Sequence, residues 1–314
     1  MLISYIKKIS ILVSVLMINL FIVNYINTHA FPIYAQQGYE NPREATGRIV
    51  CANCHLAQKN VSIEIPKSVL PNSVFEAKVE IPYDSNLQQP LSNGQLGSIN
   101  TGAVLILPEG FTLAPKKLLS EELKTKTKNV YIQSYSTSKP NILVVGPLGG
   151  KNKEIIFPIL SPDPNKNTSI SFLKYPVYIG ANRGRGQIYP AGDKTNNNPI
   201  LASYSGKIIE IISSPETGNK IIKIEKSNGE IYTENIPSSL SIKVHEGNIV
   251  NVSDNLTNDP NVGGFGQNET EIVLQNPLRI KAMIVFFITV TLAQIFFVLK
   301  KKQWEKVQAA DMNF

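Results

Sequence analysis

The sequence predicts an all-β fold for most of this 314-residue chain, with a single membrane-spanning helix near its C-terminus. The β fold is predicted by short runs of β-branched residues that recur along the chain and are bounded by Pro, Gly, Asn or Ser. Helix start signals are scarce between the two ends of the chain. The membrane helix is predicted by one long apolar stretch that contains no charge.

The first 30 residues have the pattern of a cleaved signal peptide. Two lysines are followed by an apolar stretch from Ile9 to Ile26, and Thr28-His29-Ala30 places small residues at both positions that a signal peptidase reads. Cleavage of residues 1–30 would make Phe31 the mature N-terminus and would export the residues that follow. An uncleaved anchor is the weaker alternative, because three asparagines interrupt the apolar stretch.

One short helix is predicted after the leader. Asn41 can cap it and Pro42 suits its first position, and an acidic residue stands three positions after the cap, as in a capping box. On such a helix Cys51, Cys54 and His55 would project from one face.

The segment Cys51-Ala52-Asn53-Cys54-His55 is a C-x-x-C-H motif, the attachment signal for a c-type haem. Each cysteine can form a thioether to the porphyrin, and the histidine can bind the iron as an axial ligand. A zinc site is disfavoured, because the motif offers three ligands and no second cluster supplies more. A dithiol redox pair or a disulfide is the stronger rival, but no βαβ pattern surrounds the motif.

The usual second axial ligand of such a haem, a methionine, is not found in the exported body of the chain. Methionine is the common partner of histidine in cytochromes c, but the four methionines lie in the leader and in the C-terminal anchor and tail. Of the other histidines, His29 belongs to the leader, and His245 lies in a Lys-Val-His-Glu-Gly segment typical of a strand that enters a turn. We interpret His245 as a surface residue, so an unusual ligand or an open site has to be considered.

Eight runs predict strands in the exported body, and their spacing is typical of a β-sandwich. In the first run, apolar and polar side chains alternate from Phe75 to Ile81. Residues Lys117–Lys124 could form another short helix. The polar stretch from Gly192 to Asn198 separates a larger set of strands from a smaller one. The remaining runs are Ala103–Leu107, Ile142–Val145, Ile155–Leu160, Tyr175–Ile179, Ile208–Ile212, Ile221–Ile224 and Ile272–Leu274.

The apolar stretch from Ala282 to Leu299 is about eighteen residues long, which predicts a transmembrane helix over residues 280–300. Three lysines follow it, so the positive-inside rule keeps the tail, residues 301–314, on the side of synthesis. Between Phe31 and Asn276, 23 basic and 22 acidic side chains give a net charge of +1. The basic character of the whole chain therefore reflects membrane topology, and no basic stripe indicates nucleic-acid binding.

Two further features of the sequence predict neither a cofactor site nor a catalytic site. The glycines of Gly180-Ala-Asn-Arg-Gly-Arg-Gly do not match a dinucleotide fingerprint, and we interpret Arg183 and Arg185 as loop or packing residues. A Ser-His-Asp triad cannot be assembled once His55 binds iron, because His245 is then the one exported histidine left to act as base. The sequence therefore predicts no catalytic triad.

Long strings of this chain resemble the cytochrome f family, the haem-bearing subunits of the photosynthetic cytochrome bf complex. The similarity runs from Phe31 to His55 and continues in Ala103–Gly110, Gly180–Pro190, Asn261–Gln267 and the single anchor. The resemblance implies one covalently bound haem c on Cys51 and Cys54. Its iron ligands would be His55 and the α-amino group of the mature N-terminus, Phe31. Most members of the family begin with tyrosine, but a main-chain nitrogen can bind iron whatever the side chain.

The resemblance also implies an elongated β-sandwich with a small second β domain. The expected division is a large domain over residues 31–198, a small domain over 199–255, and a return to the large domain with a linker over 256–279. The residues expected to pack near the haem are Pro32, Tyr34, Tyr189 and Pro190.

The implied function is transfer of single electrons from the Rieske iron–sulfur protein of the same complex to plastocyanin or a soluble c-type cytochrome. The protein would be an electron carrier without substrate chemistry of its own, held in the thylakoid membrane by one helix with its large N-terminal part in the lumen. Other cytochrome bf subunits and membrane lipid are its expected neighbours. Green-plant members present a lysine cluster to an acidic partner, whereas the loop from Gln88 to Leu96 contains no lysine. The leader lacks the character of a transit peptide, which fits a plastid-encoded or cyanobacterial gene.

Two rival classes can be weighed against this interpretation. A periplasmic, membrane-anchored cytochrome of a bacterial reductase would share the haem motif, but it would have no reason to match the string that begins at Phe31. A haem-free β-sandwich binding module tethered to the membrane would require the two cysteines to form an incidental disulfide.

Overall fold

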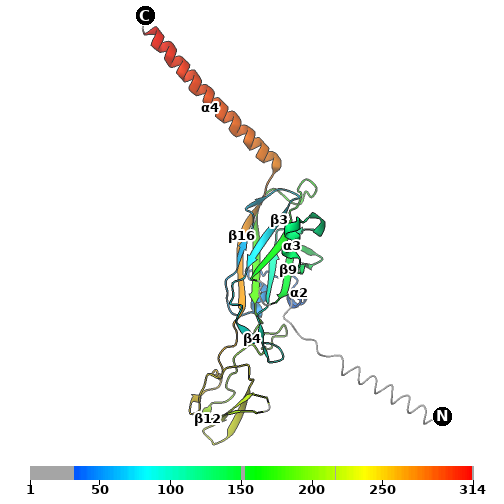
Figure 1. Ribbon diagram of the computed structural model, residues 1–314, viewed down its shortest axis with the longest axis vertical. Coiled ribbons are helices and arrows are strands. Elements are labelled where there is room, and N and C mark those ends of the chain that lie inside the picture. The colour runs from blue at the N-terminus through cyan, green and yellow to red at the C-terminus, as the bar shows by residue number, and fades with distance from the viewer. Residues whose placement is uncertain (1–31, 150–152, 216, 313–314) are drawn as a thin grey trace, which may run out of the picture. The chain divides into compact units, whose positions relative to one another are not determined.

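The computed structural model describes residues 32–149, 153–215 and 217–312. These residues are mostly β-strands, joined in four sheets, and they end in one long apolar helix (Figure 1). The predicted all-β class with one C-terminal membrane helix is confirmed. The predicted leader and Phe31 lie outside the described residues.

The chain divides into two compact units. Among the described parts, the larger unit contains Pro32–Leu87, Ser98–Gly184 and Val262–Phe314, and the smaller unit contains Gln88–Gly97 and Arg185–Asn261. The domain limits implied by the family resemblance stay predictions.

The larger unit is a sandwich of two sheets. The first has the spatial order β1 (Ser62–Glu64), β3 (Val74–Glu80), β10 (Glu154–Leu160) and β7 (Thr112–Leu113). The second has the order β2 (Ser68–Val69), β16 (Gly264–Leu274), β11 (Lys174–Arg183), β6 (Thr101–Ile106), β9 (Lys139–Leu148) and β8 (Ile132–Ser136). Neighbouring strands are antiparallel except for the parallel pair β2 and β16.

Side chains from both sheets form the core between them. Val79 of β3 and Phe157 of β10 are fully buried, and they belong to the same cluster as Leu105 of β6 and Ile179 of β11. Each of these strands overlaps a run that the sequence predicts as a strand: β3 from its alternation of apolar and polar residues, and the others from short runs rich in β-branched residues.

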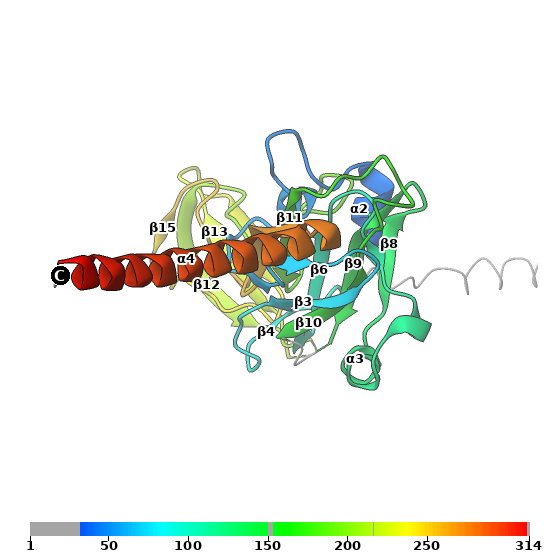
Figure 2. The ribbon, with the colours of Figure 1, turned by 90° about the horizontal axis from the view of Figure 1, so that it is seen from above.

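The six-stranded sheet is covered on its outer face as well. Leu105 and Leu143 belong to the sandwich core, whereas their neighbours Val104 and Val144 belong to a second cluster, because successive strand residues point to opposite faces. Figure 2 shows β3 and β10 on one side of β6 and β9, and α2 (Ile33–Gly38) on the other. The buried members of this outer cluster are Ile49, Val104, Tyr135, Ile142, Val144 and Phe265.

The smaller unit has its own four-stranded sheet and its own core. The sheet order is β14 (Ile231–Ile236), β13 (Lys220–Glu225), β12 (Gly206–Ser213) and β15 (Ile249–Val250). Ile208, Ile222 and Ile224 are fully buried in its core. A separate two-stranded sheet joins β4 (Gln88–Pro90) to β5 (Leu96–Ser98).

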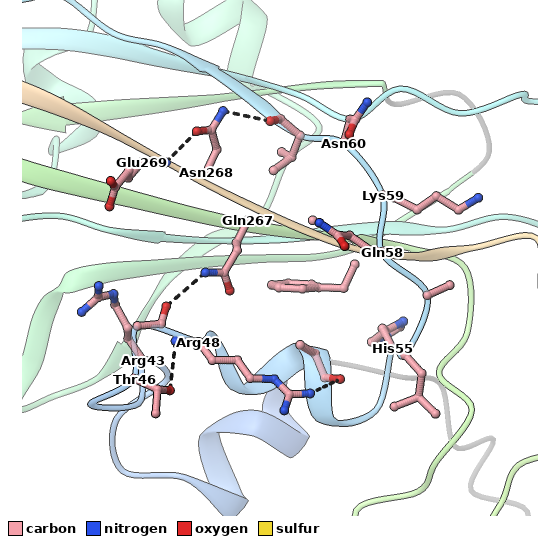
Figure 3. A pocket seen from close by; sticks show the side chains of 17 residues that line it. Arg43, Thr46, Arg48, His55, Gln58, Lys59, Asn60, Gln267, Asn268 and Glu269 are labelled. Atoms are coloured by element: carbon pink, nitrogen blue, oxygen red, sulfur yellow. Dashed lines mark hydrogen bonds between the residues drawn. The ribbon is translucent and has the colours of Figure 1, made fainter.

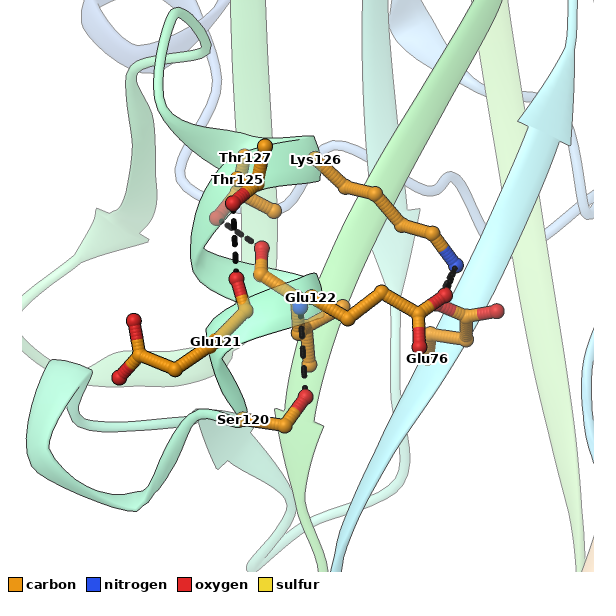
Figure 4. Close-up of polar contacts among 8 residues, drawn as sticks. Glu76, Ser120, Glu121, Glu122, Thr125, Lys126 and Thr127 are labelled. Carbon is orange, nitrogen blue, oxygen red and sulfur yellow. Dashed lines mark hydrogen bonds and ion pairs between the residues drawn. The ribbon is translucent and has the colours of Figure 1, made fainter.

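A short 3₁₀ helix, η2 (Lys116–Leu118), and helix α3 (Glu121–Thr127) overlap the segment where the sequence allows a further helix. Ser120 caps α3 by accepting a hydrogen bond from Leu123 N at 3.2 Å. Lys126 pairs with Glu122 at 2.8 Å and with Glu76 of β3 at 3.3 Å (Figure 4). Because these charges are exposed, the helix is held chiefly by the buried Leu123 side chain.

The helix predicted to start at Asn41 and to carry the cysteine motif is wrong. The Asn41 side chain accepts a hydrogen bond from Arg43 N at 3.3 Å, which forms a local turn in place of a helix cap. The chain then reverses, with Val50 N donating to Pro42 O at 2.9 Å. Gly47 completes the turn with a φ of +87°, a left-handed conformation that a helix cannot contain. The motif lies instead on a 3₁₀ helix, η1 (Val50–Asn53).

Helix α2 is attached to the outer face of the sheet by Tyr135 of β8. The Tyr135 hydroxyl, which is 2.6 Å from both Ala35 O and Tyr39 O, can donate to either carbonyl, and Gln36 Nε2 donates to Tyr135 O at 2.8 Å. Burial raises the pKa of Tyr135 to about 12, so the phenol keeps its proton and remains a donor. These bonds fix the first described residues of the chain next to the outer cluster.

The C-terminal helix α4 (Pro277–Asp311) is long and apolar enough to cross a membrane, with a mean hydropathy of 2.5 over its most apolar window. Asn276 caps it by accepting hydrogen bonds from Leu278 N at 2.9 Å and Arg279 N at 3.3 Å. Strand β16 is complete before the helix begins, so the sandwich contains none of the apolar span.

A chain that ends after Asn276 is expected to remain folded and monomeric without detergent, because both sheets of the sandwich are complete at that point. Size-exclusion chromatography and circular dichroism of the processed fragment in detergent-free buffer check this. Aggregation that only detergent reverses would show that α4 covers part of the body.

Tyr135→Phe is expected to lower the free energy of unfolding by about 1–2 kcal/mol, because the two carbonyls lose a buried donor. Denaturant titration measures the change, and hydrogen exchange at α2 locates it. The matched control is Tyr131→Phe, whose side chain is 76% exposed. Equal effects of the two substitutions would contradict the assigned role of the Tyr135 hydroxyl.

Candidate haem-binding site

The turn formed by η1 brings the three chemically distinctive residues of the motif together. Cys51 O accepts hydrogen bonds from Cys54 N at 3.3 Å and from His55 N at 3.0 Å, so a 3₁₀ turn passes into a single α-type turn. Cys51, Cys54 and His55 therefore still lie within a single helical turn, although the longer predicted helix is absent.

The residues before the motif tie it to the sheet. Ile49 and Val50 are buried. Ile49 N donates to Gln267 Oε1 at 3.0 Å, and Gln267 Nε2 donates back to Gly47 O at 3.1 Å. One glutamine of β16 thus satisfies both a donor and an acceptor of the turn that leads into the cysteines.

Gly180 of β11 provides the space into which this turn packs. A Cβ atom at Gly180 would lie 2.6 Å from Phe265 Cζ and 2.9 Å from Ile49 Cδ1, both far inside van der Waals contact. The ring of Phe265 and the side chain of Ile49 fill the place where any other residue would have a side chain. The Gly180 segment, which has no dinucleotide role, therefore has a packing role.

The residues after the motif run along the edge of β16. Lys59 N donates to Phe265 O and Phe265 N donates to Ala57 O, both at 2.8 Å. The main chains approach so closely that a Cβ atom at Gly266 would lie 2.1 Å from Lys59 O. The motif is therefore held from both sides by the same strand.

His55 is buried, with 8% of its surface exposed. Burial lowers the pKa of its imidazole to about 4, because the charged form loses its hydration, so the ring is neutral near neutral pH. Its Nδ1 atom is buried and has no hydrogen-bond partner among the described residues. A buried neutral imidazole with an unpaired ring nitrogen fits the ligand set of a haem iron.

The two cysteines are free thiols, and each is partly exposed as a residue. Burial of the thiol group raises the pKa of Cys51 to about 12, and burial also raises the pKa of Cys54. A catalytic dithiol requires the opposite shift, towards a stable thiolate. Among the described residues no group of three or more His, Cys, Asp or Glu side chains is arranged to hold a metal ion, so zinc gains no further ligand.

An open, polar groove lies beside His55 (Figure 3). Its sides come from the residues before and after the motif and from the first half of β16, Phe265 to Glu269. Arg48 Nη2 donates to Ala52 O at 3.0 Å and so connects the groove wall to η1. The guanidinium of Arg43 lies 3.8 Å from the centre of the Tyr178 ring, in cation–π contact.

The structure brings together three of the four predicted site residues, namely Cys51, Cys54 and His55, and Phe31 lies outside the described part of the chain. His245 is an exposed residue of the smaller unit, and its backbone N donates to Asn248 Oδ1 at 2.9 Å. Arg183 is a packing residue: it is 2% exposed and donates to Asn60 O at 2.6 Å.

Sequence reasoning missed the residues that position the motif, namely Tyr135, Phe265 and Gln267. Tyr135 stands in a short strand with one isoleucine and three polar residues, and no local pattern distinguishes it. The string from Asn261 to Gln267 belongs to the family resemblance, but nothing local shows its contacts with the motif, which span about 200 residues of sequence.

Two family models match this chain, apocytochrome F N-terminal over residues 31–184 and apocytochrome F C-terminal over residues 196–314. A cytochrome f of Gracilaria tenuistipitata var. liui is 71% identical over 308 residues, covering 98% of this chain and 99% of that protein. Cytochrome f proteins of Porphyra purpurea and Pyropia yezoensis are 64% and 63% identical, each covering 92% of this chain and 90% of the relative. Together with the C-x-x-C-H turn, these matches show that the chain belongs to the cytochrome f family.

Proposed function

We propose that this chain carries one covalent haem c and passes single electrons from a Rieske iron–sulfur protein to plastocyanin or a soluble c-type cytochrome. Its family makes it an electron-carrier subunit of the photosynthetic cytochrome b6f complex, with one membrane-spanning helix. The observation that carries the proposal is the turn from Cys51 to His55, with its buried neutral imidazole, set against the apolar outer face of the sheet.

In this proposal Cys51 and Cys54 each form a thioether to the porphyrin, and His55 binds the iron. The haem, when bound, supplies an iron that accepts and donates one electron. The high thiol pKa values suit cysteines that stay protonated until they are linked to the porphyrin. The burial of His55 keeps its imidazole neutral, which leaves a lone pair for the metal.

The outer cluster restricts water on one side of the site. Cys51 and Ala52 pack against the buried side chains of that cluster, which come from β6, β8, β9, β16 and Ile49 just before the motif. An apolar surrounding of this kind is one of the means by which a protein tunes the potential of a haem.

The second iron ligand in this proposal is the α-amino group of Phe31. Its support is the position of α2, because Ala35 packs in the same cluster as Cys51 and is tied to Tyr135. Phe31 precedes Ala35 by four residues in the sequence. An α-amino group has a reference pKa of about 8, so it releases its proton to a metal more readily than lysine does.

The domain limits, the cleavage after Ala30 and the lumenal position of the large N-terminal part belong to the same proposal. Support for export comes from the short leader and from the lysines that follow the apolar span. The soluble acceptor would then meet the protein on the exported side, where the haem motif lies.

His55→Ala is expected to abolish the low-spin haem spectrum, because His55 is the axial ligand within the motif and the one other exported histidine, His245, is an exposed residue of the smaller unit. Blocking leader cleavage with Ala30→Leu is expected to change the axial ligation while both thioethers form, since Phe31 then has an amide in place of an amine. Absorption and electron paramagnetic resonance spectra of the purified proteins measure both effects.

His245→Ala is the matched control, because it removes the other exported histidine and is expected to leave the spectrum unchanged. If the blocked precursor kept the native low-spin spectrum, or if His245→Ala lost it, the N-terminal ligand would be wrong. Failure of haem to survive acid–acetone extraction from the parent chain would remove the covalent site altogether.

Electron transfer to the soluble acceptor is expected to depend weakly on salt, because the exported body is nearly neutral and the loop between β4 and β5 has no lysine. We expect the second-order rate constant to change by less than about threefold between low and physiological salt, whereas steered association changes by about 10- to 1,000-fold. Stopped-flow oxidation of the reduced protein at a series of salt concentrations measures this rate constant.

The matched variant for this test adds charge to that loop. Asn93 and Gln95 are exposed, and Asn93→Lys with Gln95→Lys is expected to make the rate with an acidic acceptor faster at low salt and steeply salt-dependent. A steep dependence already present in the parent chain would reveal a steering patch made by lysines elsewhere.

A further inference from the structure

Two exposed leucines flank the end of β16 in the larger unit. Leu70, in the turn between β2 and β3, is 50% exposed, and Leu173, just before β11, is 56% exposed. Leu278 in the first turn of α4 is 75% exposed. None of these side chains contributes to the sandwich core or to the haem-binding site.

Backbone hydrogen bonds place both leucines next to the residues that lead into α4. Gln275 N donates to Val69 O at 2.9 Å, and Leu274 N donates to Leu173 O at 3.0 Å. Asn276, which caps α4, follows directly. Leu70 and Leu173 therefore lie at the end of the unit from which the membrane helix starts.

Both leucines are held by turns with satisfied polar groups. Leu70 O accepts hydrogen bonds from Ser73 Oγ at 2.6 Å and from Ser161 Oγ at 2.7 Å. Before β11, the Tyr175 hydroxyl donates to Ser171 O at 2.7 Å and accepts from Ser171 N at 3.2 Å. The leucines are thus presented to solvent by fixed backbone.

The first turns of α4 set the distance between this end of the larger unit and the membrane. From Asn276 to Ala282, where the apolar span begins, six residues correspond to about 9 Å along a helix axis. The headgroup layer on each side of the hydrocarbon core is about 5–7 Å thick. Three exposed cations lie near this junction in the chain: Lys67, whose carbonyl accepts a hydrogen bond from Val273 N at 3.0 Å, and Arg279 and Lys281 in the first turns of α4. The exposed acidic side chain of Glu271, near the end of β16, is paired with Lys174.

We propose that this face, defined by Leu70, Leu173 and Leu278, docks on the lipid headgroup layer and seats the larger unit on the membrane. The leucines enter the boundary between headgroups and acyl chains, and the cations lie among the phosphates or other anionic headgroups. The occupant is lipid because the face is continuous with a span that must itself be surrounded by lipid.

The test uses the full chain in vesicles of phosphatidylcholine and phosphatidylglycerol. Leu70→Cys and Leu173→Cys are each labelled with a thiol-reactive bimane, and the vesicles contain a lipid with a nitroxide near the top of its acyl chain. Both labels are expected to lose most of their fluorescence relative to vesicles without nitroxide. The substitutions lie at exposed sites, so the fold is retained.

Tyr131→Cys is the control position, because it is more exposed, at 76%, and precedes β8 at the other end of the sheet. Strand pairing places the start of β8 about seven residues along β11 from Lys174, or roughly 23 Å. Its label is expected to keep its fluorescence. The parent chain treated with bimane reports any reaction of Cys51 and Cys54, so a failure of haem attachment is distinguished from a failure of docking.

Equal fluorescence of all three labels with and without nitroxide lipid would overturn the proposal. Labels that escape the nitroxide lipid in the isolated chain, but become shielded from a water-soluble quencher in the assembled complex, would also overturn it. In that case the face would bind another subunit.

Discussion

The packing of Ile49 and Phe265 over Gly180 is the constraint on which the haem-binding site depends. With a side chain at position 180, the turn before the motif could not reach the sheet, since the nearest atoms lie within 3 Å of the missing Cβ. Contact at this point aligns Gln267 with the turn and Phe265 with the segment that follows the motif. The position of the cysteines is thus determined by a strand more than 200 residues away in sequence.

The site is stabilised by burial more than by charge. The ion pairs of the larger unit, such as Lys126 with Glu76, join exposed side chains and contribute little. The sheet beneath the motif has apolar residues on both faces of β6 and β9, so the same two strands take part in the sandwich core and in the outer cluster. A change that loosens the core is therefore expected to disturb the site through these shared strands.

Much of the fold could be predicted from the sequence, because strand alternation and the apolar span are local signals. The C-x-x-C-H motif could also be recognised from the sequence, because haem attachment requires the spacing of Cys51, Cys54 and His55. The helix predicted from Asn41 failed because a cap pattern is equally compatible with a turn, and tertiary contacts selected the turn. The roles of Tyr135 and Phe265 could not be predicted, because they come from contacts between segments far apart in sequence, which no local pattern encodes.

Strand β16 has a consequence for the geometry of electron transfer. Phe265 near its start supports the haem motif, and Leu274 at its end adjoins the membrane anchor, so nine residues separate the two sites by about 30 Å. This single strand acts as a fixed spacer between the haem motif and the start of α4. Removing two residues from it would shorten the spacer by one pleat and keep its inward and outward faces. Removing one residue would exchange those faces, so the length of β16 between the two sites can change only by residue pairs if both faces are to keep their packing.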